Sequence, residues 1–221
     1  MKNSSIIFTV IVLLTGNFAN AQTVNWKNIG QHKHIASINI AADFGLTYGA
    51  GYAYRLSSKR PVLLNAEYSF PSGKNITDDF KFKTGTQVRW WQSGNFHFAS
   101  AVQGIYRKYK NGYARLQNFG IDLSVTGGYY KKRWFMAGEL GFDKAIITHF
   151  KHSSLYKENF PAVKDGWYEP STGGNFYYSL KGGYTFRNKD VYLKMGKLTQ
   201  QDLNSPPMLP LYAQLGFNFR F

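Results

Sequence analysis

Hydrophobic and polar residues alternate along most of this chain, and the clearest case is its last segment. From 209 to 221 every odd position is leucine, alanine or phenylalanine, while Gln214, Asn218 and Arg220 stand at even positions. Residues 80–90, 119–126, 134–143 and 176–186 repeat the pattern. Successive side chains of a strand point to opposite faces of its sheet, so this period predicts strands with one apolar and one polar face.

The alternation predicts a chain of antiparallel strands joined by connections of two kinds. The predicted strands cover residues 38–56, 62–70, 80–91, 96–108, 116–130, 134–149, 175–186, 191–198 and 210–221. The first stretch is long for one crossing at about 3.3 Å per residue, so a loop at 43–45, with Gly45 in a left-handed conformation, divides it and gives ten strands. Treating it as one strand and merging another pair gives eight. The seven prolines fall in connections or at a strand start, where no ladder hydrogen bond is lost.

The connections alternate in length, which favours one particular architecture. Short turns are predicted at 57–60, 92–95, 131–133 and 187–190, and longer loops at 71–79, 109–115, 150–174 and 199–208. Outer-membrane barrels have short periplasmic turns and longer external loops. The fold class predicted is all-β, a transmembrane antiparallel up-and-down β-barrel.

The first residues predict export. Lys2, the apolar run 6–14 and the sequence Ala19-Asn20-Ala21 follow the order of a signal peptide. The apolar run is too short to span a bilayer as a helix. We expect residues 1–21 to be a signal peptide cleaved after Ala21, residues 22–33 a short periplasmic lead-in, and residues 34–221 the barrel.

Composition narrows the class of partner. The formal net charge of +15 invites a nucleic-acid interpretation, but an exported chain rarely meets DNA, so we expect no nucleic-acid partner. The absence of cysteine excludes disulfides and thiol chemistry. Aromatic residues make up 18% of the chain. Many of them stand near strand ends on the apolar face, where both membrane interfaces favour such rings.

The polar face is then expected to line the lumen. A basic residue facing lipid at mid-depth costs about 2–4 kcal/mol, so the charges must point inward, whereas a soluble barrel would have the reverse polarity. The predicted lumen residues are Arg55, Glu67, Lys81, Lys83, Arg89, Arg107, Asp122, Glu139, Asp143, Lys181, Lys194 and Arg220.

The C-terminus resembles a known class. Leu215, Phe217, Phe219 and Phe221 stand at alternate positions and end on an aromatic residue, as in the closing strand of bacterial outer-membrane β-barrel proteins. The resemblance implies recognition by the barrel-assembly machinery and residence in the outer membrane, in contact with its lipid and lipopolysaccharide. The aromatic-rich strands and lysine-rich turns are similar to small barrels of Bacteroidetes-type bacteria. We expect a monomer.

Several functions stay open at this stage. The lumen charges form either a structural network or an anion-biased pore for small solutes, and small barrels are mostly filled by side chains. An alternative is a lipid A-modifying hydrolase, because His152 and Ser154 resemble the His-x-Ser pair of outer-membrane lipid A deacylases.

That resemblance would make His152 the base and Ser154 the nucleophile, with Glu158 or Glu169 orienting the imidazole. A third possibility is adhesion or ligand binding by the loop 150–174. The histidine pairs at 32 and 34 and at 149 and 152 have no carboxylate cluster beside them in sequence, so no metal site and no cofactor are predicted.

Overall fold

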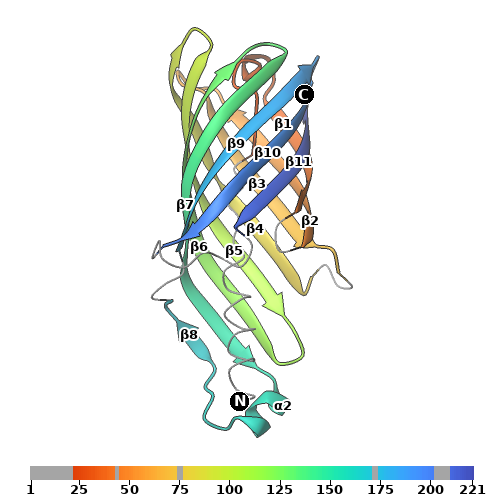
Figure 1. The fold of residues 1–221 in the computed structure, drawn as a ribbon, viewed down its shortest axis with the longest axis vertical. Helices are drawn as coiled ribbons and strands as arrows, with labels where there is room; N and C mark the ends of the chain where they lie inside the picture. The colour runs from red at the N-terminus through yellow and green to blue at the C-terminus, as the bar shows by residue number, and fades with distance from the viewer. Residues whose placement is uncertain (1–21, 43–44, 74–76, 171–173, 202–209) are drawn as a thin grey trace.

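A computed structural model describes residues 22–42, 45–73, 77–170, 174–201 and 210–221. These residues form a closed antiparallel barrel of ten strands (Figure 1). In chain order the barrel strands are β1 (His34–Ala42), β2 (Leu46–Leu56), β3 (Val62–Pro71), β4 (Asp79–Ser93), β5 (Phe96–Lys110), β6 (Ala114–Tyr130), β7 (Trp134–His152), β9 (Gly174–Phe186), β10 (Lys189–Gln200) and β11 (Leu211–Arg220).

Each barrel strand pairs with the next one along the chain, and β11 pairs with β1 to close the wall. In that closing pair Ile38 lies opposite Phe217. Beyond the last ladder pair, the backbone N–H groups of His34 and Phe221 donate to each other's carbonyl oxygens. The ten-stranded prediction is confirmed and the eight-stranded alternative is wrong. Asp43 and Phe44, in the predicted dividing loop, lie outside the described residues, as does the predicted signal peptide.

Three smaller elements complete the described chain: a 3-10 turn η1 (Ile29–Gln31), a helix α2 (Ser154–Asn159) and a strand β8 (Gly166–Tyr168) that pairs with β7. No helix in the described ranges has the length and apolarity needed to cross a membrane.

The connections lie at two ends of the barrel. Residues 57–61, 94–95, 131–133 and 187–188 form what we call the short-turn end, at the top of Figure 1. One predicted long loop at the opposite end is wrong. Residues 109–115 are mostly strand, and β5 and β6 are joined only by residues 111–113, where the Asn111 side chain accepts from the backbone N–H groups of Tyr113 and Ala114.

The prediction of a loop starting at 150 is also wrong, because β7 stays paired with β6 as far as His152, opposite Ala114. Strands β5, β6 and β7 therefore continue past the rest of the wall, and β8 and α2 lie beside their far end at the bottom of Figure 1. We call this projecting part, residues 106–118 and 147–168, the extension.

Burial alternates along the strands as the sequence pattern predicts. Large apolar side chains point away from the barrel, including Ile38 at 63% exposed and Leu180 at 67%, while neighbours such as Lys194 and Asn218 are fully buried inside. In a membrane this arrangement places apolar groups in lipid and polar groups in the lumen.

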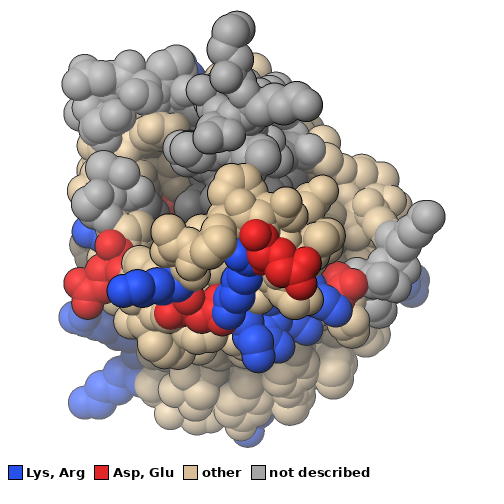
Figure 2. All heavy atoms as spheres, turned by 90° about the horizontal axis from the view of Figure 1, so that it is seen from below, with Lys and Arg blue, Asp and Glu red and all other residues tan. Residues whose placement is uncertain are grey.

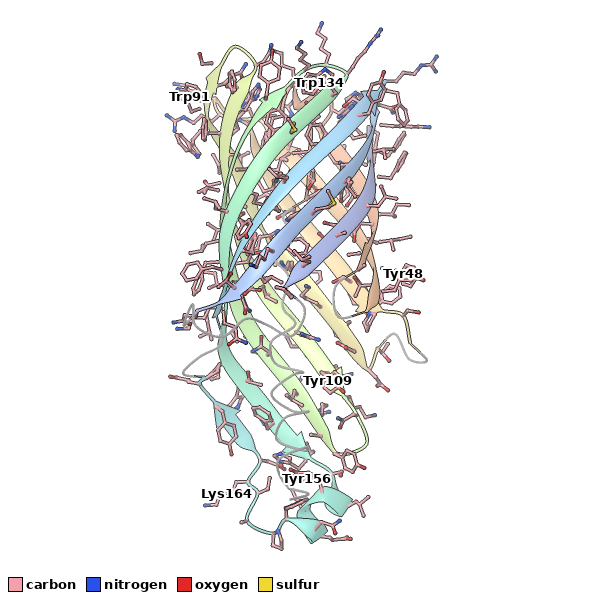
Figure 3. The ribbon with its side chains drawn as sticks, in the orientation of Figure 1. Tyr48, Trp91, Tyr109, Trp134, Tyr156 and Lys164 are labelled. Atoms are coloured by element: carbon pink, nitrogen blue, oxygen red, sulfur yellow. The ribbon has the colours of Figure 1, made fainter. Side chains whose placement is uncertain are left out.

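Aromatic rings form two groups that flank the outer apolar band (Figure 3). At the short-turn end, Trp90 and Trp91 contact Phe98, and Tyr129 contacts Trp134. Near the other end, ring-to-ring contacts run from β2 across to β8, with centroid separations of 5.0–6.1 Å. This rim belt consists of Tyr48, Phe70, Tyr68, Phe80, Tyr106, Phe119 and Trp167.

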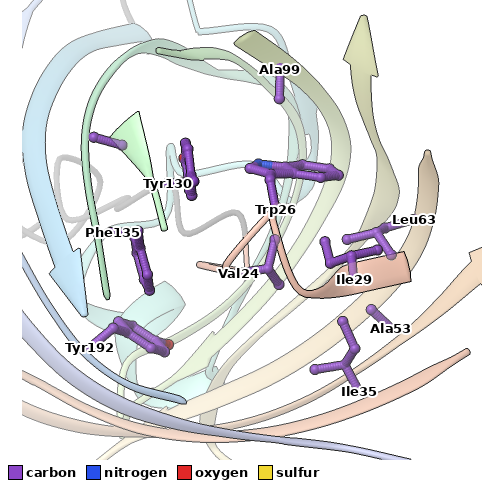
Figure 4. Packing of buried hydrophobic residues seen from close by; sticks show 11 residues of the cluster. Val24, Trp26, Ile29, Ile35, Ala53, Leu63, Ala99, Tyr130, Phe135 and Tyr192 are labelled. Atoms are coloured by element: carbon purple, nitrogen blue, oxygen red, sulfur yellow. The ribbon is translucent and has the colours of Figure 1, made fainter. Parts of the chain in front are cut away.

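The largest buried apolar cluster lies inside the barrel near the short-turn end. Val24, Trp26 and Ile29, all from the segment before β1, pack there against inward side chains that include Tyr130 and Phe135 (Figure 4). The segment predicted as a lead-in thus supplies part of the core.

Candidate functional site: the lumen and the extension

A shared carboxylate on one strand contacts side chains from three other strands inside the lumen. Glu139 on β7 lies 2.6 Å from the Lys194 ammonium on β10, and its other oxygen contacts Lys181 on β9. The Thr126 hydroxyl on β6 donates to the same carboxylate at 3.3 Å. Both lysines and the glutamate are at most 6% exposed, and a buried carboxylate is tolerated only when it is paired in this way.

Two further ion pairs occupy the lumen. Lys83 lies 3.0 Å from Asp122, which also accepts a hydrogen bond from the Tyr177 hydroxyl at 2.9 Å. Arg220 on β11 lies 2.7 Å from Asp190.

The sequence pattern predicts a turn at Asp190, but β10 begins one residue before it, and its side chain is buried inside the barrel. The alternation of Tyr192 and Lys194, continued back by one step, would have found it.

The remaining predicted lumen residues also lie on the inner face. Arg107 is 3.7 Å from Asp79, and Lys81 lies opposite Arg107 in the ladder. The amide of Asn39 donates to Glu67 at 3.1 Å, and that of Asn175 donates to Asp143 at 3.0 Å.

Two lumen arginines donate hydrogen bonds to the N-terminal segment and not to a carboxylate. Arg55 donates to the His32 carbonyl at 3.2 Å, and Arg89 donates to the Trp26 carbonyl at 3.1 Å. Further hydrogen bonds come from the barrel wall: Asn218 donates to the Thr23 carbonyl at 2.6 Å.

Asn25 anchors the same segment to the short turns. Its amide is fully buried and donates to the Lys131 carbonyl and to the Thr185 hydroxyl, both at 2.9 Å. Residues 22–32 therefore occupy the short-turn end of the lumen and are hydrogen-bonded to the wall on several sides.

Inward glycines let tyrosine rings fill the space that is left. A Cβ atom on Gly141 would lie 2.1 Å from Tyr177 Cζ, and one on Gly216 would lie 2.1 Å from Tyr192 Cζ. Both tyrosines are 2% exposed. The lumen is thus packed with rings and paired charges at these levels.

The second candidate region is the extension. His152 Nδ1 lies 3.0 Å from Asp165 Oδ1, and the His152 backbone N–H donates to the same oxygen at 2.8 Å. Lys157 donates to the other oxygen at 2.6 Å. These hydrogen bonds hold the pKa of Asp165 well below its ordinary value, and the bond from the His152 backbone N–H has the largest effect.

The predicted catalytic set is only partly assembled. The carboxylate at the His152 imidazole is Asp165, not Glu158 or Glu169. Ser154 is the exposed first residue of α2, and no hydrogen bond joins it to His152 among the residues described. The hydroxyl that caps the helix, accepting from the Tyr156 N–H, belongs to Ser153.

The histidines at the other end have ordinary contacts. His34 Nδ1 lies 2.6 Å from the Tyr52 hydroxyl, and its ring stacks on Phe221. Within the described ranges no three metal-ligating side chains come together.

Comparisons with known proteins give only distant matches. No protein-family model and no curated protein matches the chain. Among solved structures, the KdgM porin is 10% identical, with 85% of this chain and 99% of the porin covered and a TM-score of 0.44. The same porin in complex with disordered oligogalacturonate gives 9% identity, the same coverage and a TM-score of 0.43. The outer-membrane enzyme PagL gives 11% identity, the same coverage and a TM-score of 0.38. Likenesses at this level carry no argument about substrate or activity.

Proposed function

We propose that this protein is an integral barrel of the bacterial outer membrane. The support is the outward apolar band, which is flanked by aromatic rings at both ends, together with the buried charged residues that line the inner face. A membrane favours that polarity, because apolar side chains are stable in lipid whereas a basic residue facing lipid at mid-depth costs about 2–4 kcal/mol. The N-terminal pattern of a signal peptide supports export.

We further propose that the lumen is closed and that the barrel has a structural role and is not a constitutively open pore. One observation carries this: five lumen cations pair with lumen carboxylates, and two more donate to the backbone of residues 22–32. The five are Lys83, Arg107, Lys181, Lys194 and Arg220, and the two are Arg55 and Arg89. An anion pathway needs cationic groups that face water and attract the ion, whereas groups such as Lys194 and Arg89 are already engaged.

Conductance in planar bilayers tests the closed lumen. The full exported chain, shown to be folded by its heat-modifiable migration on a gel, should give no discrete openings. Steady anion-selective openings of the same preparation would overturn the closed barrel and support the pore. Recovery of the chain as a soluble periplasmic protein would overturn the membrane assignment itself.

The hydrolase is a second candidate, and the His152–Asp165 contact is the observation that favours it. In a catalytic triad a carboxylate orients the histidine that acts as the general base for a nucleophilic hydroxyl. Release of acyl chains from lipopolysaccharide by the wild-type barrel, abolished in His152→Ala and Ser154→Ala, would establish it. Our proposal expects no release from the wild type.

A further inference from the structure

The outer face of the extension carries a row of cations placed side by side. Lys110 on β5 lies directly opposite Arg115 on β6, and Arg115 lies directly opposite Lys151 on β7. Like charges opposite one another in a sheet repel and destabilise it. An anion bound among these side chains would relieve the repulsion.

The protein itself supplies little of that anion. Lys110 lies 3.9 Å from Asp78, and both side chains are partly exposed. Among the described residues no ion pair reaches Arg115 or Lys151, and the Arg115 Nε is buried without a hydrogen-bond partner. On the end face of the molecule, by contrast, basic and acidic side chains are mixed (Figure 2).

The position of the row points to the source of the anion. Along β5, Lys110 is four residues beyond Tyr106 of the rim belt and on the same outer face. Four residues span about 13 Å of strand, or about 10 Å along the membrane normal at a strand tilt of about 40°. Lys108 lies between the two, with its ammonium 5.9 Å from the Phe80 ring. The row thus lies about 10 Å beyond the rim belt, at the level of lipid headgroups.

We propose that Lys110, Arg115 and Lys151 bind the phosphate groups of a phosphorylated glycolipid in the outer leaflet. This site rests on the proposed membrane residence. Guanidinium and ammonium groups form charge-assisted hydrogen bonds to phosphate, and arginine can donate two in parallel. The acyl chains of the same lipid would lie along the apolar band, on the membrane side of the rim belt. One ligand would then contact both the basic row and the apolar band.

Lipid binding to the full exported chain in detergent micelles, measured by native mass spectrometry, tests the site. The probe is lipid A with its phosphates, compared with the same lipid after their enzymatic removal. The double variant Arg115→Gln, Lys151→Gln should raise the Kd for the phosphorylated lipid by about tenfold. Arg115→Lys alone should weaken binding less than the double variant, because it keeps the charge but loses the two parallel hydrogen bonds.

The matched control removes two charges at the other end of the barrel. Lys59→Gln, Lys132→Gln changes exposed lysines of the short turns and should leave the Kd unchanged. The site is overturned if both double variants bind alike, or if the wild type binds both lipids equally. Heat-modifiable migration separates the two proposals: a variant that keeps it is a folded barrel, so unchanged binding then counts against the site alone.

Discussion

At the level of single residues, Glu139 ties together the most deeply buried part of the lumen. Its two oxygens are held by lysines from two different strands, and a threonine from a third strand donates to it as well. Each lysine also depends on Glu139, because without that carboxylate its buried ammonium group would lose its counter-charge. Stability at this site therefore depends on the carboxylate more than on any one lysine.

We expect Glu139→Gln to lower the free energy of unfolding by about 3–5 kcal/mol, because it leaves two buried ammonium groups without their carboxylate. Urea unfolding of the barrel in lipid vesicles measures the change. Glu158→Gln, an exposed change of the same chemistry on α2, should stay within about 0.5 kcal/mol. Equal effects of the two substitutions would show that the lumen network does not hold the barrel.

Two glycines of one strand test how tightly the lumen is filled. Gly141→Ala should destabilise the barrel by about 1–3 kcal/mol, because the new methyl group would overlap the Tyr177 ring. Gly138→Ala, also on β7, meets nothing within 4 Å and should leave stability unchanged or raised. The same urea titration measures both, and a neutral Gly141→Ala would mean that the lumen has room at this level.

At the level of elements, the extension owes its shape to strands that continue beyond the proposed membrane. Its outer end is held by Asp165, which joins the end of β7 to α2 through His152 and Lys157. Because these bonds lower the pKa of Asp165, they stabilise the extension fully above the ordinary carboxyl pKa of about 4. That stabilisation is lost as the pH falls through the lowered pKa.

Pepsin cleavage within residues 153–168, followed as the pH is lowered from about 4, measures this dependence. The wild type should stay resistant until well below the ordinary carboxyl pKa. Asp165→Asn should be cleaved readily throughout, with rates normalised to a free peptide of the same sequence. Parallel pH profiles for the two proteins would contradict the bridging role of Asp165.

The strands inside the apolar band could be predicted from the sequence, because an apolar outer face and a polar inner face impose alternation. The apolar outer face, and with it the alternation, ends at the rim belt. Residues 108–117 and 149–152 lie beyond the outer apolar band, so strands persist there without an apolar period, and the sequence alone suggests loops. Asp190 does carry a local signal, because it continues the alternation of Tyr192 and Lys194 by one step. Residues 22–32 are placed by hydrogen bonds to distant strands, which leave no local pattern.

At the level of the whole molecule, the barrel is closed in two senses. Pairing of β1 with β11 leaves no free edge in the wall, and the N-terminal segment packs into the short-turn end. The other end carries the extension with its aromatic and basic outer face. The two ends therefore differ in chemistry, and we expect the short turns in the periplasm and the extension outside.

Labelling of single cysteines in intact cells tests this orientation and the membrane span together. The chain has no cysteine of its own, so Lys164→Cys in the extension and Lys132→Cys in a short turn each give one thiol. With a bulky membrane-impermeant maleimide, we expect labelling at 164 in intact cells and at 132 only after the outer membrane is permeabilised. Equal labelling of both in intact cells, or the reverse order, would contradict it.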